Sequence, residues 1–509
     1  MVCFPVGPDG AHRVRNDSAE TVRVPMFSEV AFPTVTVYPD SDKVGVYTPG
    51  RRDGVVVRRS STSATSTASL AEASTGSPSG GRCFGPPGHF AGPASPIASA
   101  AMPEVIFSID RDLSVPMVEQ AVPGHNRWHP DIPPVVAVDP GGSYRVECKE
   151  WTDEQIANSD SPDDVASVNL DKCHMLSGPF AINGAEPGDI LVVDILDMGP
   201  FPEHEWGYTG IFAKGNGGGF LCDHFPDAAK AVWDIEGIYC SSRHLPGVRF
   251  AGLSHPGLLG CAPSHDLLAE WNRREAALVA ANPDRVTGDP RNETQDPPLA
   301  LPPLEKDALL GTLPADDYPR VAGEAARTVP PRDHGGNVDI KNLSKGTRVY
   351  FPVYVEDALF SIGDLHFSQG DGEITFCGAI EMPGYIDLGF DLIKGGVAKY
   401  GLDAANPHGN PIFKPGPVEP NYSSYLMFQG ICVEDGRNYY MDATVAYRRA
   451  CLNAVEYLKL ALGYTGEQAY LLLGAAPIEG RIGGIVDIPN CAVTVGIPLE
   501  IFDRDILPR

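Results

Sequence analysis

Short apolar runs, each bounded by turn-forming residues, constrain the fold of this chain more than any other feature of its sequence. "PPVVAVDPGG", "DILVVDILDMGP" and "TRVYFPVYVEDALFSIGD" are examples, with Gly, Pro, Asp or Asn at their ends. Runs of this length between turn residues are typical of β-strands. The sequence therefore predicts an α+β fold that is predominantly β, a strand-rich domain with a few late helices.

Three segments show helical spacing instead. The segment "SHDLLAEWNRREAALVAANP" has Ser264 or His265 near its start as a helix cap. Near the C-terminus, "MDATVAYRRACLNAVEYLKLALGY" predicts an amphipathic helix, and "GEQAYLLLGAA" predicts a buried one that follows it. Residues 285–335 are rich in Pro, Asp and Arg, which predicts a long surface insertion.

The N-terminal hundred residues differ in composition from the rest. Residues 1–101 include a long tract of Ser, Thr, Ala, Gly and Pro that offers little to bury, so we expect a low-complexity, disordered extension. The alternating stretches "PTVTVYP" and "GVVVRR" leave room for a fragment of strand. Globular composition begins at Met102, which predicts one folded domain over residues 102–509.

Charge and cysteine content limit the partners and the compartment. The net charge of −27 disfavours nucleic acid and anionic membranes, which repel an acidic protein. The sequence has no uncharged apolar stretch long enough to predict a membrane-spanning helix. Its eleven cysteines are scattered and never form a CxxC pair, which favours reduced thiols and a cytoplasmic location.

The stretch "GDLHFSQGDGE", residues 363–373, crowds metal-ligand side chains behind an apolar run. On a strand, Asp364 and His366 stand two residues apart and share a face. Gly residues permit a turn, after which Glu373 is expected to begin another strand. Asp and His ligands suit Zn²⁺, and also Fe²⁺ or Mn²⁺. Glu381 is left out of this site, because it lies eight residues beyond Glu373, which is roughly 26 Å along a straight strand, and only a bend at Gly378 would bring it back.

Similar polar clusters occur elsewhere. "GHNRWHPDIPP" carries His129 and Asp131, "DHGGNVD" carries Asn337 and Asp339, and "SHPGLLGCAPSHD" carries His255. Taken singly, each cluster has an ordinary structural reading as a turn with solvated acids or a hydrogen-bonded histidine.

Two alternatives to metal chemistry stay open at this point. A cysteine nucleophile at Cys173 or Cys261 would give the chain a metal-free thiol mechanism. A binding protein stabilised by a structural ion such as Ca²⁺ in the Asp-rich turns would not be an enzyme at all. The sequence has no G-x-S-x-G elbow, and "KGNGGGF" lacks the GK[ST] ending of a phosphate loop.

Several blocks from Met102 almost to Arg509 together resemble the acetamidase/formamidase family, and its formamidase branch in particular. The blocks are "GHNRWHPDIPP", "GFLCDHFPDAAKAVWDIEGIYCSSRHLPGVRFAGLSHPGLLGCAPS", "GGNVDIKNL", "GDLHFSQGDGEITFCGAIEM", "AYRRACLNAVEYL" and "GEQAYLLLGAAPIEGRIGGIVDIPN". The resemblance implies hydrolysis of formamide to formate and ammonia, with weaker activity on acetamide. It also implies a cytoplasmic, mostly β enzyme that forms homo-oligomers.

These residues predict a metal-assisted hydrolysis. We expect Asp364 and His366 to hold a divalent metal, most simply zinc, with Asp339 or the pair His129 and Asp131 completing its ligands.

The remaining predicted roles concern the proton and the pocket. Glu373 would take the proton of the attacking water and deliver it to ammonia, and Asn337 would donate to the oxyanion. Trp128, Phe367 and His255 are the residues expected to enclose a small substrate.

Overall fold

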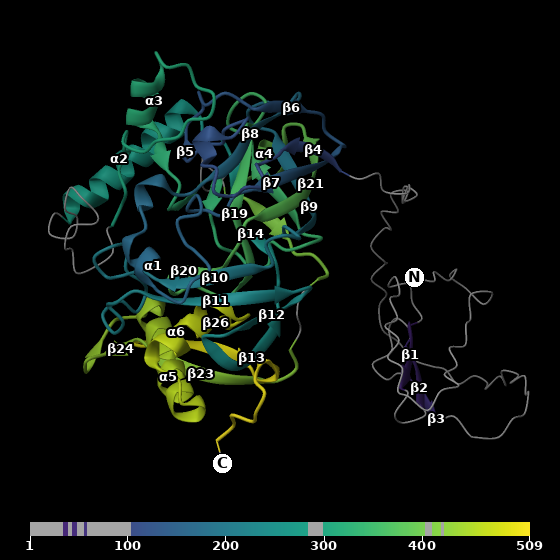
Figure 1. Cartoon of the computed structure of the whole chain (residues 1–509), viewed down its shortest axis with the longest axis vertical. Coiled ribbons are helices and arrows are strands. Elements are labelled where there is room, and N and C mark those ends of the chain that lie inside the picture. Colours follow the sequence, from purple (N-terminus) through teal and green to yellow (C-terminus); the bar gives the residue numbers. More distant parts are fainter. Residues whose placement is uncertain are drawn as a thin grey trace, which may run out of the picture. The chain divides into compact units, whose positions relative to one another are not determined.

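The computed structural model describes residues 103–282, 299–402, 410–418 and 422–508, together with three short strands nearer the N-terminus (Figure 1). These strands, β1 (Thr34–Tyr38), β2 (Lys43–Tyr47) and β3 (Val55–Arg58), form an antiparallel sheet. A strand fragment is thus present in both stretches where the sequence left room for one. The predicted disorder of the rest of residues 1–101 lies outside the described residues, and the predicted domain start at Met102 stays a prediction.

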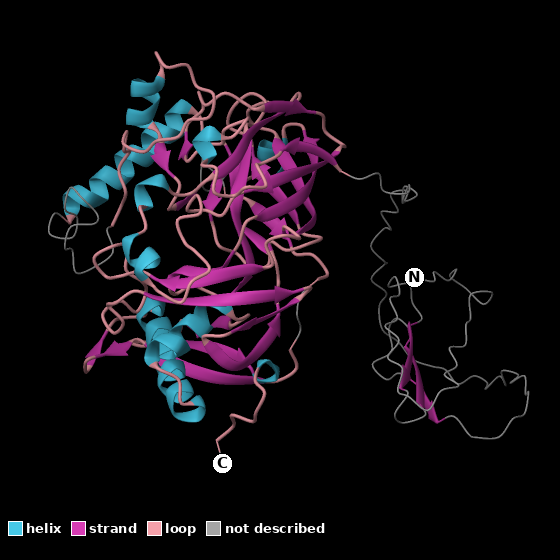
Figure 2. Cartoon of the chain, in the orientation of Figure 1, coloured by secondary structure: helices cyan, strands magenta, loops and turns pink. Residues whose placement is uncertain are grey.

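Contacts within the chain divide it into two units, Met1–Pro96 and Ile97–Arg509. The second unit contains two large sheets, as Figure 2 shows. One sheet has six strands, antiparallel except for the pair β4 and β7. Its order is β22 (Ile412–Lys414), β18 (Arg348–Pro352), β9 (Ile190–Pro200), β21 (Gly384–Ile393), β7 (Ser143–Cys148) and β4 (Glu104–Phe107).

The other sheet has eleven strands and carries the chemistry discussed below. Nine of them follow the order β13 (Leu245–Ala251), β12 (Tyr239–Ser242), β11 (Ala229–Glu236), β10 (Trp206–Ile211), β20 (Phe376–Glu381), β19 (Phe360–Gln369), β14 (His255–Cys261), β17 (Gly335–Asn337) and β16 (Pro331–Arg332). β8 (Leu176–Ile182) also pairs with β19, and β6 (Val136–Val138) pairs with β8. All ten residues of β19 are buried, although half of them are polar.

The C-terminal part adds a smaller sheet with two helices. β23 (Tyr425–Ile431), β27 (Ala492–Pro498) and β26 (Glu479–Gly484) form this sheet, and α5 (Ala443–Leu462) packs on β23 and β27. The approach is close, since a Cβ on Gly430 would lie 2.0 Å from the carbonyl oxygen of Ala446. α6 (Gly466–Ala475) packs against β10 and β20 of the large sheet.

The three predicted helices are confirmed, and local capping explains where they begin. Ser264 accepts a hydrogen bond from the amide of Leu267 and caps α2 (His265–Ala281). Asp442 caps α5 in the same way, and Thr465 forms a reciprocal capping box with Gln468 at the start of α6.

The prediction of a surface insertion over residues 285–335 is wrong from Val321 onward, whereas between residues 299 and 320 only Ala300 and Leu310 are buried. α3 (Tyr318–Glu324) buries Val321 and Ala322, and β15 (Ala326–Arg327) pairs with β5 (Arg127–Trp128) in the interior. The reason is that a Pro-rich segment can still be buried when neighbouring strands accept its backbone hydrogen bonds. Residues 283–298 lie outside the described part. The remaining described helices and strands of this unit are α1 (Asp163–Ser167), α4 (Gly396–Tyr400), β24 (Val433–Glu434) and β25 (Arg437–Asn438). Three 3₁₀ helices of three residues each lie at Met117–Glu119, Leu170–Lys172 and Leu499–Ile501.

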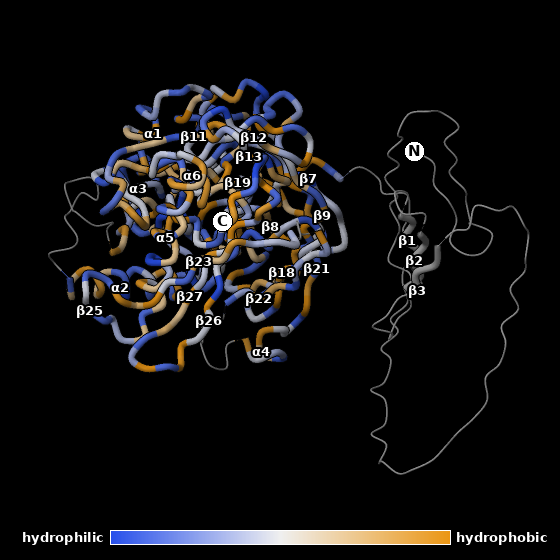
Figure 3. The backbone as a smooth tube through the Cα atoms, turned by 90° about the horizontal axis from the view of Figure 1, so that it is seen from below, coloured by the Kyte–Doolittle hydropathy of each residue, from blue (hydrophilic) through white to orange (hydrophobic). Residues whose placement is uncertain are grey.

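One large apolar core joins the two big sheets and the C-terminal helices. The hydropathy along the chain changes over short intervals, as Figure 3 shows, which suits strands that bury one face each. Among the described residues, no helix is long and apolar enough to cross a membrane.

Candidate functional site

The hairpin formed by β19 and β20 brings three ionisable side chains together. His366 and Glu381 are register partners across the hairpin. The His366 Nε2 atom lies 3.2 Å from Asp364 Oδ1 and 3.1 Å from Glu381 Oε2, and all three side chains are buried. The exclusion of Glu381 is therefore wrong. The straight-strand estimate fails because the chain reverses at residues 370–375, which returns position 381 to position 366.

Glu373 lies in the turn of this hairpin. The expectation that it begins a strand is wrong, since β20 starts only at Phe376. The reversal points Glu373 back toward β19, where it joins Asp339 and His366 in a second group of potential ligands. In each group the ligand atoms lie within 4.8 Å of one another. His366 belongs to both groups, so five side chains meet at one place.

Asp339 reaches the hairpin from a different part of the sheet. It follows β17, and its amide donates to the carbonyl oxygen of Gly257 in β14 at 3.1 Å. β14 pairs with β19 as well, so the same strand supports both sides of the cluster.

Backbone conformation marks these positions as unusual. Asp339, Asp364 and Glu373 have φ angles of 47°, 57° and 42°. Non-glycine residues seldom adopt this left-handed region, and such strain gathers at functional sites.

Gly257 supplies the space into which the cluster converges. A Cβ there would lie 2.5 Å from Asp364 Oδ2, 2.5 Å from His366 Cε1 and 2.7 Å from Asp339 Oδ1. Only a glycine allows these atoms to approach the strand so closely.

A second layer of polar groups orients His366. Its Nδ1 atom lies 3.1 Å from Gln369 Oε1 and 3.3 Å from His255 Nε2. His255 is fully buried, with Nδ1 2.7 Å from the carbonyl oxygen of Leu253 and Nε2 2.9 Å from the same Gln369 Oε1, an amide oxygen that can only accept. His366 therefore carries a proton on Nδ1 and directs Nε2 at the carboxylates.

The pKa values in the cluster reflect four acids crowded beside one histidine. Burial raises the pKa of Glu373 and of Glu381 to about 8 each. Burial, with the charge of Glu373 beside it, raises the pKa of Asp339 well above its usual range. Burial acts on Asp364 in the same direction, but the charge of His366 outweighs it and lowers the pKa of Asp364. Burial would lower the pKa of His366, yet Glu381 and Asp364 raise it well above normal.

A cavity of about 490 Å³ opens beside this cluster. Asn337, Asp339, Glu373 and His174 all line it. Asn337 donates through Nδ2 to the carbonyl oxygen of Val329 at 3.1 Å, and its buried Oδ1 has no partner among the described residues. Asn337 is thus better placed to accept a hydrogen bond than to donate one to an oxyanion.

A model of the acetamidase/formamidase family matches residues 110–504. The chain belongs to the acetamidase/formamidase family. A formamidase from Methylophilus methylotrophus is 58% identical over 386 residues, which cover 76% of this chain and 91% of that relative. An acetamidase from Mycolicibacterium smegmatis is 61% identical over 388 residues, covering 74% and 91%. Among solved structures, a gamma lactamase from Delftia acidovorans has a TM-score of 0.74 and 53% identity, covering 80% of this chain and 95% of that one.

The family resemblance and the strand-rich fold predicted from the sequence are therefore confirmed. Two residues at the site, His174 and Gln369, were given no role from the sequence. His174 lines the cavity, and its amide donates to Thr328 Oγ1 at 2.6 Å. Gln369 orients His366 and also donates to the carbonyl oxygen of Asp339 at 2.6 Å. The signal for Gln369 was its place in "GDLHFSQGDGE", three residues after His366.

His129 and Asp131 lie in a different group of ligands. The third member of that group is His265 at the start of α2. Arg320 already donates to Asp131 Oδ2 at 2.7 Å, and His129 Nε2 lies 3.2 Å from Glu324 Oε2. A guanidinium beside the carboxylate occupies the place of a cation, so this group does not complete the hairpin site as the sequence suggested.

The three residues expected to enclose the substrate do not line the cavity. The ring of Trp128 is buried against His334, with centroids 4.4 Å apart. Phe367 follows His366 on β19, so the strand alternation sends its buried side chain to the opposite face. His255 lies behind His366, as described above.

Neither of the two candidate cysteines, Cys173 and Cys261, offers an activated nucleophile. Burial raises the pKa of the Cys173 and Cys261 thiols well above normal, so neither is ionised near neutral pH. Cys261 is completely buried, and it does not line the cavity.

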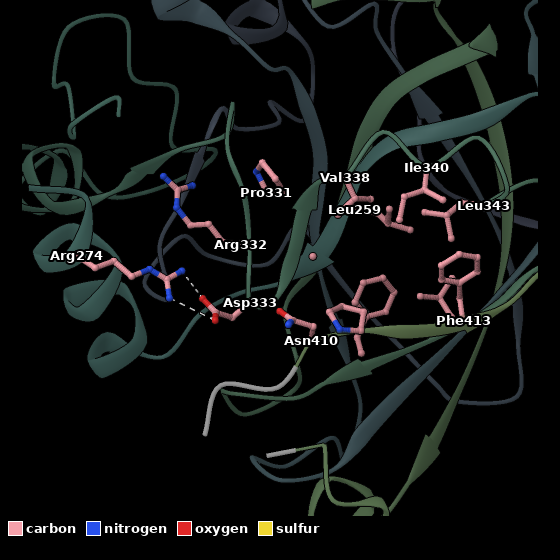
Figure 4. Close-up of a pocket in the computed structure, with 14 residues that line it drawn as sticks. Leu259, Arg274, Pro331, Arg332, Asp333, Val338, Ile340, Leu343, Asn410 and Phe413 are labelled. Atoms are coloured by element: carbon pink, nitrogen blue, oxygen red, sulfur yellow. Dashed lines mark hydrogen bonds and ion pairs between the residues drawn. The ribbon is translucent and has the colours of Figure 1, made fainter. Parts of the chain in front are cut away.

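A second cavity, of about 450 Å³, shares the segment 331–340 with the first. Along this segment Asn337 and Asp339 face the site, whereas Val338 and Ile340 line the second cavity. Figure 4 shows apolar side chains on one side of it and the pair Arg274 and Asp333 on the other, 2.5 Å apart. Because its charged groups neutralise each other, the first cavity is the better candidate for chemistry.

Proposed function

We propose that the chain hydrolyses short amides, with formamide and acetamide as substrates. The observation that carries this function is the convergence of five ligand-type side chains beside a cavity in a member of this family, namely Asp339, Asp364, His366, Glu373 and Glu381. The alignments with the formamidase and the acetamidase each cover about three quarters of this chain. In the reaction the oxygen of water bonds to the carbonyl carbon and the C–N bond breaks. One water proton goes to the leaving nitrogen, and the second ionises from the new carboxyl group and is taken up by ammonia.

We further propose that Asp364, His366 and Glu381 hold a divalent metal ion, zinc in the first instance, with Asp339 beside them. The residues fit such an ion, because buried His366 Nε2 and Glu381 Oε2 face each other at 3.1 Å, and neither these atoms nor buried Asp339 Oδ1 makes a well-aligned hydrogen bond to another described residue. A mixed set of imidazole and carboxylate ligands suits zinc, iron or manganese. When bound, such an ion lowers the pKa of its water to about 7 and polarises a carbonyl oxygen.

Glu373 is the proposed proton carrier of the reaction. It lies beside Asp339 and His366, and burial raises its pKa above the ordinary range, so it can hold a proton for the leaving nitrogen. It lines the cavity and sits on a turn, where it can face a bound amide. Asn337 Oδ1 is the proposed acceptor for the substrate's NH₂ group, which would hold the amide plane in place.

The test is ammonia release from formamide and acetamide by the purified full chain, before and after chelation, with single metals added back. We expect formamide hydrolysis that falls on chelation and returns with one ion. Asp364→Asn and Glu381→Gln should abolish activity without unfolding the protein, whereas Asp391→Asn, an exposed carboxylate on β21, should have no effect. Activity that survives chelation and both substitutions refutes the site.

A cyclic amide is a second candidate substrate. The cavity is much larger than formamide requires, and the structural relative with 53% identity is a gamma lactamase. We propose that five-membered lactams enter the same site and open to amino acids by the same hydrolysis. Assay of 2-pyrrolidinone alongside formamide tests this, and no ring opening at high enzyme concentration excludes it.

We also propose a cytoplasmic homo-oligomer. Exposed apolar side chains on the sheet of β23, β27 and β26 and on the following loop support association, since monomers seldom expose many such groups together. They are Met427, Ile431, Ile482, Ile485, Val486 and Ile488. The nine cysteines in the described part of the chain carry free thiols, which suits a reducing compartment. Light scattering during size-exclusion chromatography would measure the mass directly, and a mass of one chain would contradict the oligomer.

A further inference from the structure

We infer that the site acts on amides with an apolar acyl chain of about four to six carbons, and prefers the longer of these. The inference rests on the proposed function, because it assigns a substrate class to the same site. It concerns the part of the cavity that the hydrolytic residues leave unused.

The first argument is size. Formamide has three non-hydrogen atoms, while the cavity measures about 490 Å³. Cavities of roughly 300–1,000 Å³ normally enclose much larger ligands. A substrate of three atoms would leave most of this space to water.

The second argument is the chemistry of the walls. Apolar side chains from five separate segments make up much of the lining: Trp151, Leu170, Phe212, Leu299, Leu301 and Phe376. The ring of Trp151 lies 4.9 Å from that of His174 and 6.2 Å from that of Phe212, so an apolar path leads away from the polar cluster.

The charged lining residues do not select a charged ligand. Arg327 Nη2 lies 3.3 Å from Asp171 Oδ1 and also donates to the carbonyl oxygen of Leu170 at 2.9 Å. These opposite charges neutralise each other at the wall. The lining therefore suits a neutral amide with a hydrocarbon chain.

The third argument is Phe376, which follows the Glu373 turn. Its side chain is 42% exposed although it lines the cavity, and its φ angle is 70°. A bulky residue in this region is strained, and an exposed aromatic ring gains nothing from burial. A bound acyl chain would cover the ring, which gives this arrangement a function.

The first measurement compares kcat/KM for formamide, butanamide, pentanamide and hexanamide. The three longer amides have carbonyl groups of equal reactivity, so their differences report binding alone. Each methylene that leaves water should raise kcat/KM about two- to fourfold, or about 4- to 16-fold from butanamide to hexanamide. If formamide is hydrolysed but kcat/KM is flat or falls along the series, the inference is overturned and the proposed function stands. If no amide is hydrolysed, the proposed function itself is wrong.

The second measurement uses Phe376→Gly. Glycine tolerates a positive φ, so the variant should keep or raise the melting temperature. The ratio of kcat/KM for hexanamide over formamide should fall at least fivefold. Met441→Gly is the matched control, since Met441 has a φ of 55° and does not line this cavity, and it should leave the ratio unchanged.

Leu301→Asn provides an independent wall variant, and it should lower the same ratio without touching the hairpin. An unchanged ratio in both Phe376→Gly and Leu301→Asn, with a lower melting temperature, would show that these side chains only stabilise the fold.

Discussion

Replacing Gly257 by alanine adds a single carbon atom at the centre of the candidate site. Gly257 lies on β14 with an ordinary φ, so alanine itself is compatible with the backbone. The new Cβ would stand 2.5 Å from Asp364 Oδ2 and from His366 Cε1, and 2.7 Å from Asp339 Oδ1. Ordinary contacts between such atoms are about 3.4–4 Å, so the three side chains must retreat by about 0.7–1 Å.

The retreat determines the expected size of the effect. Metal ligands are held within about 0.2 Å of their distances, and a displacement of about 1 Å in a catalytic arrangement can cost about 100-fold in rate. Overpacking of a buried site destabilises a protein by about 1–3 kcal/mol. We therefore expect Gly257→Ala to remain folded, to lose stoichiometric metal and to lose at least 100-fold in kcat on formamide.

The assay combines metal analysis after dialysis, ammonia release and urea unfolding. Gly199→Ala on β9 is the matched control, because its Cβ would meet nothing nearer than 3.8 Å, and it should behave like the parent chain. A Gly257→Ala protein that retains both its metal and its kcat would refute the convergence of these side chains on one point.

Three further predictions concern other residues. Burial raises the pKa of Glu150 to about 7, so the folded state holds this proton more tightly than the unfolded state does. The free energy of unfolding should therefore fall between pH 5 and 8, by up to about 3 kcal/mol. Urea titrations at several pH values should show a shallower fall in the Glu150→Gln variant. Cys173→Ser and Cys261→Ser should each keep kcat within a few-fold, since neither thiol is ionised; loss of turnover in a folded variant would restore the cysteine mechanism. Trp128→Ala should cost about 3–5 kcal/mol of stability in denaturant titrations and leave the preference for formamide over acetamide unchanged, because the ring is buried away from the cavity; a changed preference would make it a gate.

The strand-rich fold could be predicted because its signals are local. Apolar runs between turn residues mark β9 and β18, and capping residues such as Ser264 mark the start of α2. The burial of residues 325–328 could not be foreseen, since they lie in a polar stretch that is rich in Pro, Asp and Arg and resembles a surface loop. Whether such a segment is buried depends on β5, which lies about 200 residues away in sequence.

Part of the candidate site was likewise predictable from local sequence, and part of it was not. By itself the sequence determined the strand that carries Asp364 and His366, because an apolar run followed by turn residues predicts a strand there. Only the tertiary structure decided that Glu381 joins them and that His129 and Asp131 do not. A chain reversal at residues 370–375 and the pairing of β14 with β19 set those distances, and they depend on which strands become neighbours in the sheet. Spacing along a sequence records the period of one strand, whereas a site is built from several strands whose order is fixed only when the whole core is packed.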